Sequence, residues 1–160
     1  MRIKIFVLLC LTAIMQFTGV TPLKASHYYY KQLSLKDGVT SAVRCILTDK
    51  QGFVWIGTKA GISRYDGHEL KKYVYSPNNP HSIPNNLIHQ IAEDEMSNIW
   101  ILTDKGIARY QRQSDDFFLP TDEKGNPIIA YSTCLTKDGV LFGSKDKVYF
   151  LSLIHISEPT

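Results

Sequence analysis

The sequence predicts an all-β fold built from repeated four-stranded antiparallel sheets. Residues 46–65 align without a gap on residues 91–110, and nine of the 20 aligned pairs are identical. Each copy alternates short β-prone runs with clusters of turn residues. No apolar stripe with the 3.6-residue period of a helix separates these runs, which argues against a parallel α/β fold.

The first copy predicts four strands in chain order. A tight turn at 49–52 separates the first two strands, and a second turn at 59–61 separates the next two. Asp66-Gly67 then turns the chain into the fourth strand. The predicted strands are 43–48, 53–58, 62–65 and 70–75.

The repeat length is that of a β-propeller blade, which has four short strands every 40 to 45 residues. A weaker third copy spans 135–149; it is one residue shorter and has no Trp. We therefore expect about three blades of an incomplete ring. The predicted organisation is a signal peptide at 1–25, a lead-in segment at 26–42, blades at 43–86 and 87–128, a partial third blade at 129–151, and a tail at 152–160.

The two ends of the chain differ from the repeats. A basic start, an apolar run from Ile5 to Met15 and a small residue at Ala25 have the layout of a secretory signal. The alternative is a retained membrane anchor, although Gln16, Thr18 and Pro22 interrupt the run. The tail at 152–160 continues no blade pattern and resembles translated adapter sequence, so we expect it to be non-native. Its alternative is a divergent final strand.

The charge balance bears on the class of partner. The formal net charge of +3 comes from the first 25 residues, and the rest of the chain holds 15 basic and 15 acidic residues. A protein that binds nucleic acid through phosphate attraction is therefore not expected in this segment. Three cysteines exclude a disulfide scaffold and a four-cysteine zinc site. After export, Cys45 and Cys134 could pair, but two separately buried thiols are the favoured interpretation.

The recurring residues have structural explanations. A tryptophan at 55 and at 100 suits the gap between neighbouring blades, where its indole N–H needs one partner. The aspartates at 49 and 94 can cap turns, and the glycines at 61 and 106 can supply positive φ or a close approach of backbones. Residues repeated in every blade cannot all lie in one site, which favours structure over catalysis. The predicted framework is Asp49, Gly52, Trp55, Gly57, Gly61, Tyr65, Asp94, Trp100, Gly106 and Tyr110.

The pattern Asp-x-x-Gly-x-x-Trp-x-Gly-Thr-x-x-Gly-(Ile/Leu)-x-Arg-Tyr-Asp, over residues 49–66, resembles the two-component regulator propeller repeat. The segment 28–38 and the loop 77–83 also resemble parts of that family, so the resemblance covers about residues 27–150. In the second copy, Ser97 and Leu102 stand where the first copy has glycines.

This resemblance implies a fragment of the periplasmic sensor propeller of a hybrid two-component sensor histidine kinase. Family members carry further blades, an immunoglobulin-like domain, a transmembrane helix and a cytoplasmic kinase, and many sense oligosaccharides. The implied partners are the remaining blades and downstream domains of a parent protein, an oligosaccharide ligand, and a second copy of the parent. The implied location is the periplasm, with the parent anchored in the inner membrane.

The search for active-site chemistry predicts no catalytic, cofactor-binding or metal residue, so we do not expect an enzyme. The five histidines lack metal-ligand spacing, and no nucleophile elbow or phosphate loop occurs. The aromatic and acidic run 115–118 could contact a sugar, but a hairpin end is favoured; likewise, 71–75 is interpreted as a strand rather than a nucleic-acid contact. A stand-alone secreted binding module, or a propeller enzyme, is the alternative function.

Overall fold

The computed structural model describes Gln32 and residues 41–152. The predicted signal peptide, most of the lead-in segment and residues 153–160 lie outside the described residues. The chain divides into two compact units, Met1–Gln32 and Leu33–Thr160, and every strand belongs to the second.

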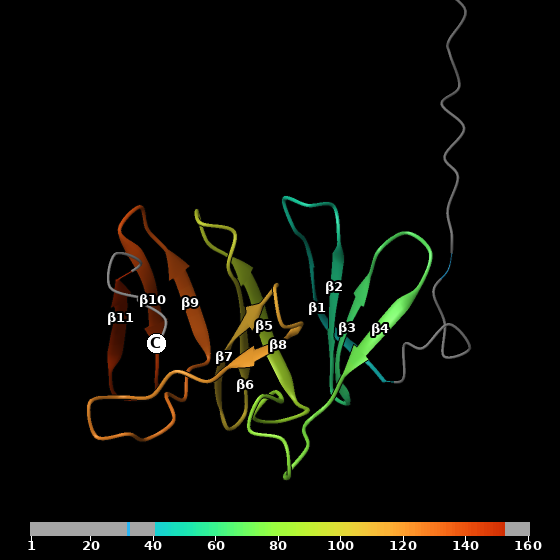
Figure 1. Cartoon of the computed structure of the whole chain (residues 1–160). Coiled ribbons are helices and arrows are strands. Elements are labelled where there is room, and N and C mark those ends of the chain that lie inside the picture. The colour runs from blue at the N-terminus through green and yellow to red at the C-terminus, as the bar shows by residue number, and fades with distance from the viewer. Residues whose placement is uncertain (1–31, 33–40, 153–160) are drawn as a thin grey trace, which may run out of the picture. The chain divides into compact units, whose positions relative to one another are not determined.

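The described residues form eleven strands and no helix (Figure 1). The predicted strands of the first copy are confirmed, with small shifts at their ends. The strands are β1 (Val43–Thr48), β2 (Val54–Thr58), β3 (Gly61–Tyr65), β4 (Leu70–Tyr73), β5 (Ile88–Glu93), β6 (Ile99–Thr103), β7 (Gly106–Gln111), β8 (Asp116–Phe118), β9 (Ser132–Leu135), β10 (Gly139–Gly143) and β11 (Val148–Ser152).

Each repeat folds into its own antiparallel sheet. Sheet 1 has the order β1-β2-β3-β4, and sheet 2 has the order β5-β6-β7-β8. Sheet 3 contains β9, β10 and β11 in the same sequential pattern. Because every strand pairs with its neighbour in the chain, each sheet is a meander, and the all-β prediction is confirmed.

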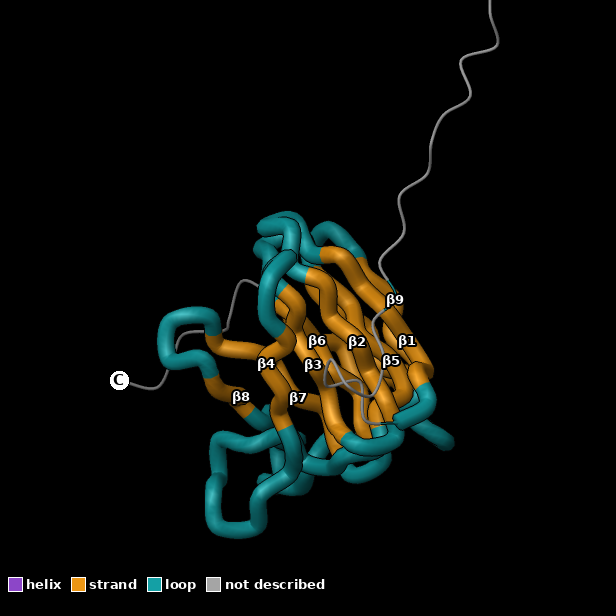
Figure 2. The backbone as a smooth tube through the Cα atoms, turned by 90° about the vertical axis from the view of Figure 1, so that its right-hand side faces the viewer, coloured by secondary structure: helices purple, strands orange, loops and turns teal. Residues whose placement is uncertain are grey.

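The sheets lie face to face with corresponding strands side by side. Figure 2 shows β1, β5 and β9 together at one side, and β4 and β8 at the other. Contacts between β1 and β5, and between β5 and β9, place these first strands next to one another. We call β1, β5 and β9 the inner strands.

Two hydrophobic clusters fill the spaces between the sheets. Each holds one of the repeat tryptophans, and each tryptophan packs against the sheet that follows its own. Burial of a large apolar side chain is worth about 1.5–3 kcal/mol, so these clusters are the main source of cohesion between sheets. The first cluster, between sheets 1 and 2, contains Trp55, Ile62, Tyr73, Ile83, Ile88, Ile91, Ile99, Ile101, Ala108, Tyr110 and Phe117; the second, between sheets 2 and 3, contains Trp100, Leu102, Ile107, Ile128, Ala130, Val140 and Phe142.

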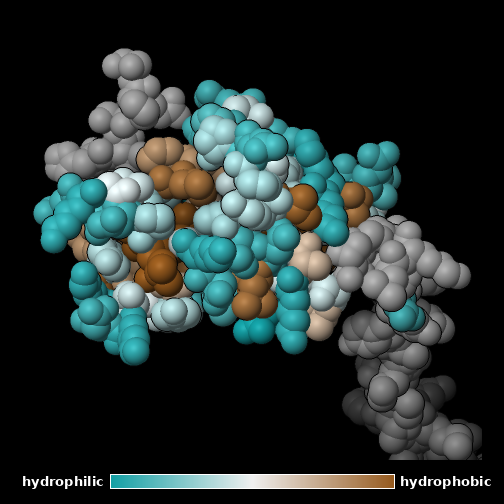
Figure 3. Space-filling model, turned by 90° about the horizontal axis from the view of Figure 1, so that it is seen from below, coloured by the Kyte–Doolittle hydropathy of each residue, from teal (hydrophilic) through white to brown (hydrophobic). Residues whose placement is uncertain are grey.

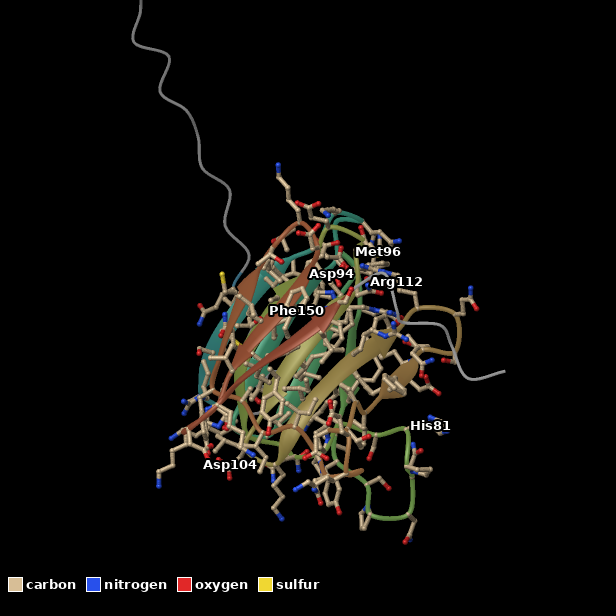
Figure 4. All side chains as sticks on the ribbon, turned by 90° about the vertical axis from the view of Figure 1, so that its left-hand side faces the viewer. His81, Asp94, Met96, Asp104, Arg112 and Phe150 are labelled. Atoms are coloured by element: carbon tan, nitrogen blue, oxygen red, sulfur yellow. The ribbon has the colours of Figure 1, made fainter. Side chains whose placement is uncertain are left out.

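The sheets have two distinct ends. The upper end carries the turns that follow the first and third strands of a sheet, and the lower end carries the turns that follow the second strands. Figure 4 shows Asp94, Met96 and Arg112 at the upper end and Asp104 at the lower end.

Candidate functional site

The framework aspartates and tryptophans come together in pairs. The Asp49 carboxylate accepts hydrogen bonds from the backbone N–H groups of Gln51 and Phe53 at 3.0 and 2.9 Å, and from the Trp55 indole at 3.0 Å. Asp94 likewise accepts from the Trp100 indole at 2.8 Å. Both indoles are fully buried, so each aspartate caps its turn and also satisfies a buried donor.

Hydrogen bonds keep the first of these aspartates ionised. Burial alone would raise the pKa of Asp49, but donors from Trp55, Phe53 and Arg112 outweigh it and lower the pKa below the ordinary value.

The framework glycines serve two different needs. Gly52, Gly61 and Gly106 have φ of 89°, 112° and 153°. At position 57 a glycine is required because there is no room for a side chain. A Cβ on Gly57 would lie 2.5 Å from Cys45 Sγ and 2.7 Å from Ile88 Cγ2. The absent side chain of Gly57 therefore leaves room for one side chain of β1 and one of β5.

The framework tyrosines lie in different surroundings. Tyr110 is buried between sheets 1 and 2, edge-on to Trp55 with ring centroids 4.8 Å apart. The hydroxyl of Tyr65 donates to the carbonyl of Gly67 in the next turn at 2.5 Å.

A polar cluster around Asp115 joins sheets 1 and 2. Its Oδ1 accepts hydrogen bonds from the hydroxyls of Tyr73 at 2.6 Å and Tyr110 at 2.5 Å, and Arg64 Nη1 lies 3.3 Å away. Lys71 pairs with the other carboxylate oxygen. Burial would raise the pKa of Asp115, yet these donors lower it to about 2. Asp115 is thus a hairpin-turn residue used for structure, with Phe117 buried behind it, as the favoured interpretation of 115–118 has it.

A second polar contact between sheets 1 and 2 centres on Arg112. Its guanidinium donates to Gln51 Oε1 at 2.7 Å, to Asp49 Oδ2 at 3.2 Å and to the Ser97 carbonyl. Glu93 lies behind it with Oε1 buried and without a hydrogen bond, 3.8 Å from the same guanidinium. The other oxygen of Glu93 accepts a hydrogen bond from the backbone N–H of Lys50 at 2.9 Å, and Oε1 is the one buried side-chain oxygen without a hydrogen bond in the described part of the chain.

The candidate functional site is a pocket of about 540 Å³ beside Arg112 at the upper end. Amide, hydroxyl and guanidinium groups dominate its wall, which suits recognition of a hydroxylated ligand by hydrogen bonds. Within residues 41–152, no three His, Cys, Asp or Glu side chains form a group that could hold a metal ion. The pocket is lined by Gln51, Met96, Ser97, Asn98, Arg109, Tyr110, Gln111, Arg112, Gln113 and Ser114.

The alignment of the two repeats gives no indication that Arg112 or Asp115 has a role. The 45-residue offset pairs them with Gly67 and Leu70, which share no chemistry with them. A residue that acts once, between one pair of sheets, leaves no signal in a comparison of copies.

The two cysteines do not pair. Cys45 is half-buried, which raises the pKa of its thiol, and Cys134 is exposed. The prediction of two buried thiols is therefore wrong for Cys134, because its side of sheet 3 has no sheet packed on it in the described structure.

The first repeat is similar to a known protein family. Residues 37–60 match the model of the two component regulator propeller. The chain carries a two component regulator propeller repeat. This match confirms the resemblance, and it covers strands β1 and β2 of sheet 1.

A curated relative of the propeller repeat is histidine kinase P4 of Formosa agariphila, which is 37% identical over 59 residues. Those residues are 36% of this chain and 4% of the relative.

Two solved structures share the fold, both from B. thetaiotaomicron. One is described as the extracellular domain of a one component system and the other as that of a hybrid two component system. They are 21% and 20% identical to the chain, both with a TM-score of 0.61. They match 79% and 75% of this chain, which spans only 19% and 18% of theirs.

In the described part of the chain, no helix has the length and apolar character that crossing a membrane requires.

Proposed function

We propose that the chain is part of the periplasmic sensor propeller of a two-component signalling protein, which senses a glycan-derived ligand and signals to a cytoplasmic histidine kinase. The observation that carries the proposal is the propeller repeat match at 37–60, together with the histidine kinase relative. The solved neighbours support an extracellular position for the same fold.

The upper-end pocket supports the ligand class. A saccharide presents many hydroxyl groups, and amide, hydroxyl and guanidinium groups recognise them through directional hydrogen bonds. Gln113 and Ser114 are exposed in the pocket wall and are available to a ligand. The remaining blades and downstream domains of the parent would enclose this end and transmit the change.

The experiment is a transcriptional reporter driven by the full-length parent and exposed to a panel of oligosaccharides. One oligosaccharide should induce the reporter, and Gln113→Ala should raise the concentration needed for half-maximal induction. Asn78→Ala, in an exposed loop at the lower end, is the matched control and should respond normally. A parent gene without a kinase region would instead favour a secreted binding module.

A further inference from the structure

Sheet 3 lacks the strand that completes the other two sheets. In sheets 1 and 2, a fourth strand pairs antiparallel with the third, as β4 does with β3 and β8 with β7. Sheet 3 stops at its third strand, and within residues 41–152 no strand pairs with the outer edge of β11. Such an edge presents unpaired backbone N–H and C=O groups, to which an extended polypeptide can add as a further strand.

A groove runs along this open edge. In sheet 2, the backbone N–H of Phe117 donates to the carbonyl of His81 at 3.0 Å, so β8 lies between β7 and the loop that precedes its sheet. The corresponding space in sheet 3, between β11 and the loop 121–128, is a pocket of about 580 Å³. One wall consists of five consecutive residues, Lys147–Leu151, which point alternately to the two faces of the sheet, so the pocket follows the edge of the strand. The loop lies at the lower end (Figure 1), where Figure 3 shows hydrophobic side chains exposed among hydrophilic ones.

Arg109 is a buried cation without an anion. It shares the face of β7 that meets sheet 3 with Ile107, a member of the second hydrophobic cluster. Arg109 is only 9% exposed, and its guanidinium lies 5.3 Å from the centre of the Phe118 ring. Among the residues that the structure describes, none accepts a hydrogen bond from this guanidinium or forms an ion pair with it. A charge that is buried without a partner is costly, so Arg109 favours an anion in the upper-end pocket that it lines.

The contact between sheets 1 and 2 shows which anion fits this position. Arg64 is the repeat counterpart of Arg109, since each pairs across its sheet with a framework tryptophan. Arg64 Nη1 lies 3.3 Å from Oδ1 of Asp115, which belongs to the following sheet and directly precedes its fourth strand. The carboxylate and the fourth strand therefore come from one segment.

The repeat supplies no such carboxylate in sheet 3. In strand register, Leu151 of β11 is the counterpart of Tyr110 of β7. Asp115 follows Tyr110 by five residues, and the residue five positions after Leu151 is Ile156. An anion for Arg109 therefore has to come from another segment.

We propose that the edge of β11 and Arg109 together bind an extended polypeptide segment in which an aspartate is followed, two residues later, by an apolar residue. The segment adds antiparallel to β11, as β8 does to β7, and its apolar side chain enters the groove. The aspartate lies in the turn before the added strand and forms a charge-assisted pair with the Arg109 guanidinium. This interaction goes beyond the sensing role and does not depend on it.

The probe is a fluorescently labelled peptide with the sequence of residues 112–120, the segment that occupies this place in sheet 2. Titration with the purified chain should give a saturable rise in its fluorescence anisotropy. A peptide with Asp115→Asn should bind about tenfold more weakly, because it has lost the carboxylate that pairs with the arginine. A peptide with Asp116→Asn, the matched control with the same loss of charge, should bind as the unchanged peptide does.

Variants of the chain assign this preference to Arg109. Arg109→Gln should abolish the preference for the unchanged peptide over the Asp115→Asn peptide, and Arg109→Lys should keep part of it. Arg44→Gln, at an exposed arginine of β1, should keep all of it. A peptide that does not bind, equal binding of the Asp115→Asn peptide, or a preference that survives Arg109→Gln would each overturn the proposal. A gain in affinity with Glu158→Gln would also overturn it, because the chain's own carboxylate would then occupy the arginine. None of these results bears on the reporter experiment, which changes Gln113 in the parent.

Discussion

At the scale of single residues, each of the two framework aspartates has two structural roles. Asp49 and Asp94 each close a turn at the upper end and also accept the indole N–H of a tryptophan buried between sheets. The loop conformation of one sheet is therefore tied to its packing on the next. A buried indole without an acceptor would cost about 1–3 kcal/mol, which explains why Asp and Trp recur together.

Replacement of Trp100 by alanine should destabilise the chain by about 3–5 kcal/mol, because it leaves a cavity in the second cluster. Leu141 is the matched control. It occupies the corresponding position of sheet 3 but is only half-buried on the side of the sheet that faces away from sheet 2. Leu141→Ala should cost much less. Equal losses in chemical denaturation of the two variants at micromolar concentration would contradict the packing role of Trp100.

The Asp115 cluster predicts a loss of stability in acid. The folded pKa of about 2 is lower than the unfolded value of about 3.9, so the stabilisation is complete above that value and disappears as the pH falls from about 4 to about 2. At 1.36 kcal/mol per pKa unit the effect is about 2.5 kcal/mol. Asp115→Asn should therefore be less stable than the wild type at pH 6 and equally stable near pH 2. A constant difference in unfolding free energy across this range would refute the assignment.

At the scale of strands and turns, the departures from the repeat have local reasons. Ser97 adopts φ of 64° in the turn where Gly52 has 89°, so the turn keeps its shape at the expense of a strained serine. Leu102 replaces Gly57 and is fully buried in the second cluster. In sheet 1, the absence of a side chain at Gly57 leaves room for Cys45 and Ile88. In sheet 2, the side chain of Leu102 fills the equivalent space.

The sequence predicts the elements that recur in every sheet, but not the contacts that occur once. The strands and the tryptophan positions follow from the repeat, because every sheet needs the same pleat and the same face buried. The contacts of Arg112 and Asp115 do not, because they lie in turns with no counterpart and depend on how two sheets meet. The register shifts in β1 and β5 do not follow from the repeat either, because a bulge has no reliable signature in a single sequence.

Gly57→Ala should destabilise the chain by about 1–3 kcal/mol, the usual cost of overpacking. The new methyl group would collide with Cys45 Sγ and Ile88 Cγ2. Cys45→Ala removes one of these atoms, so the double variant should recover part of the loss. A double-mutant cycle in unfolding free energy measures this coupling. Strict additivity of the two substitutions would show that the backbone, and not the collision, sets the cost.

At the scale of the whole molecule, sheet 3 leaves one face open in the described structure. Leu141 pairs across the sheet with Cys134 and with Phe150, so the three side chains share that face, and Val148 follows by alternation. Val148 is 70% exposed and Phe150 54%. Apolar area left in water forgoes about 25 cal/mol per Å², and β11 adds an open strand edge.

The purified chain should therefore self-associate through this face and edge. Val148→Lys should shift the population toward monomer in sedimentation velocity, because it places a charge on the open face. Met96→Lys is the matched control, since Met96 is 65% exposed but lies at the upper end. A wild-type chain that sediments as a monomer and unfolds in one cooperative transition would show that these three sheets are sufficient by themselves.

Each repeat tryptophan packs against the sheet that follows its own. The order of synthesis therefore sets the order in which the sheets can finish folding. Trp55 belongs to sheet 1, but most residues of the cluster that buries it come from sheet 2, the last of them Phe117. At 5–20 residues per second the ribosome needs roughly 3–12 s to make the intervening segment. During that time the indole stays exposed to solvent, because the sheet that buries it has not yet been made. A chaperone that holds nascent chains would therefore meet an exposed tryptophan in sheet 1 and again in sheet 2, each time one sheet behind the point of synthesis.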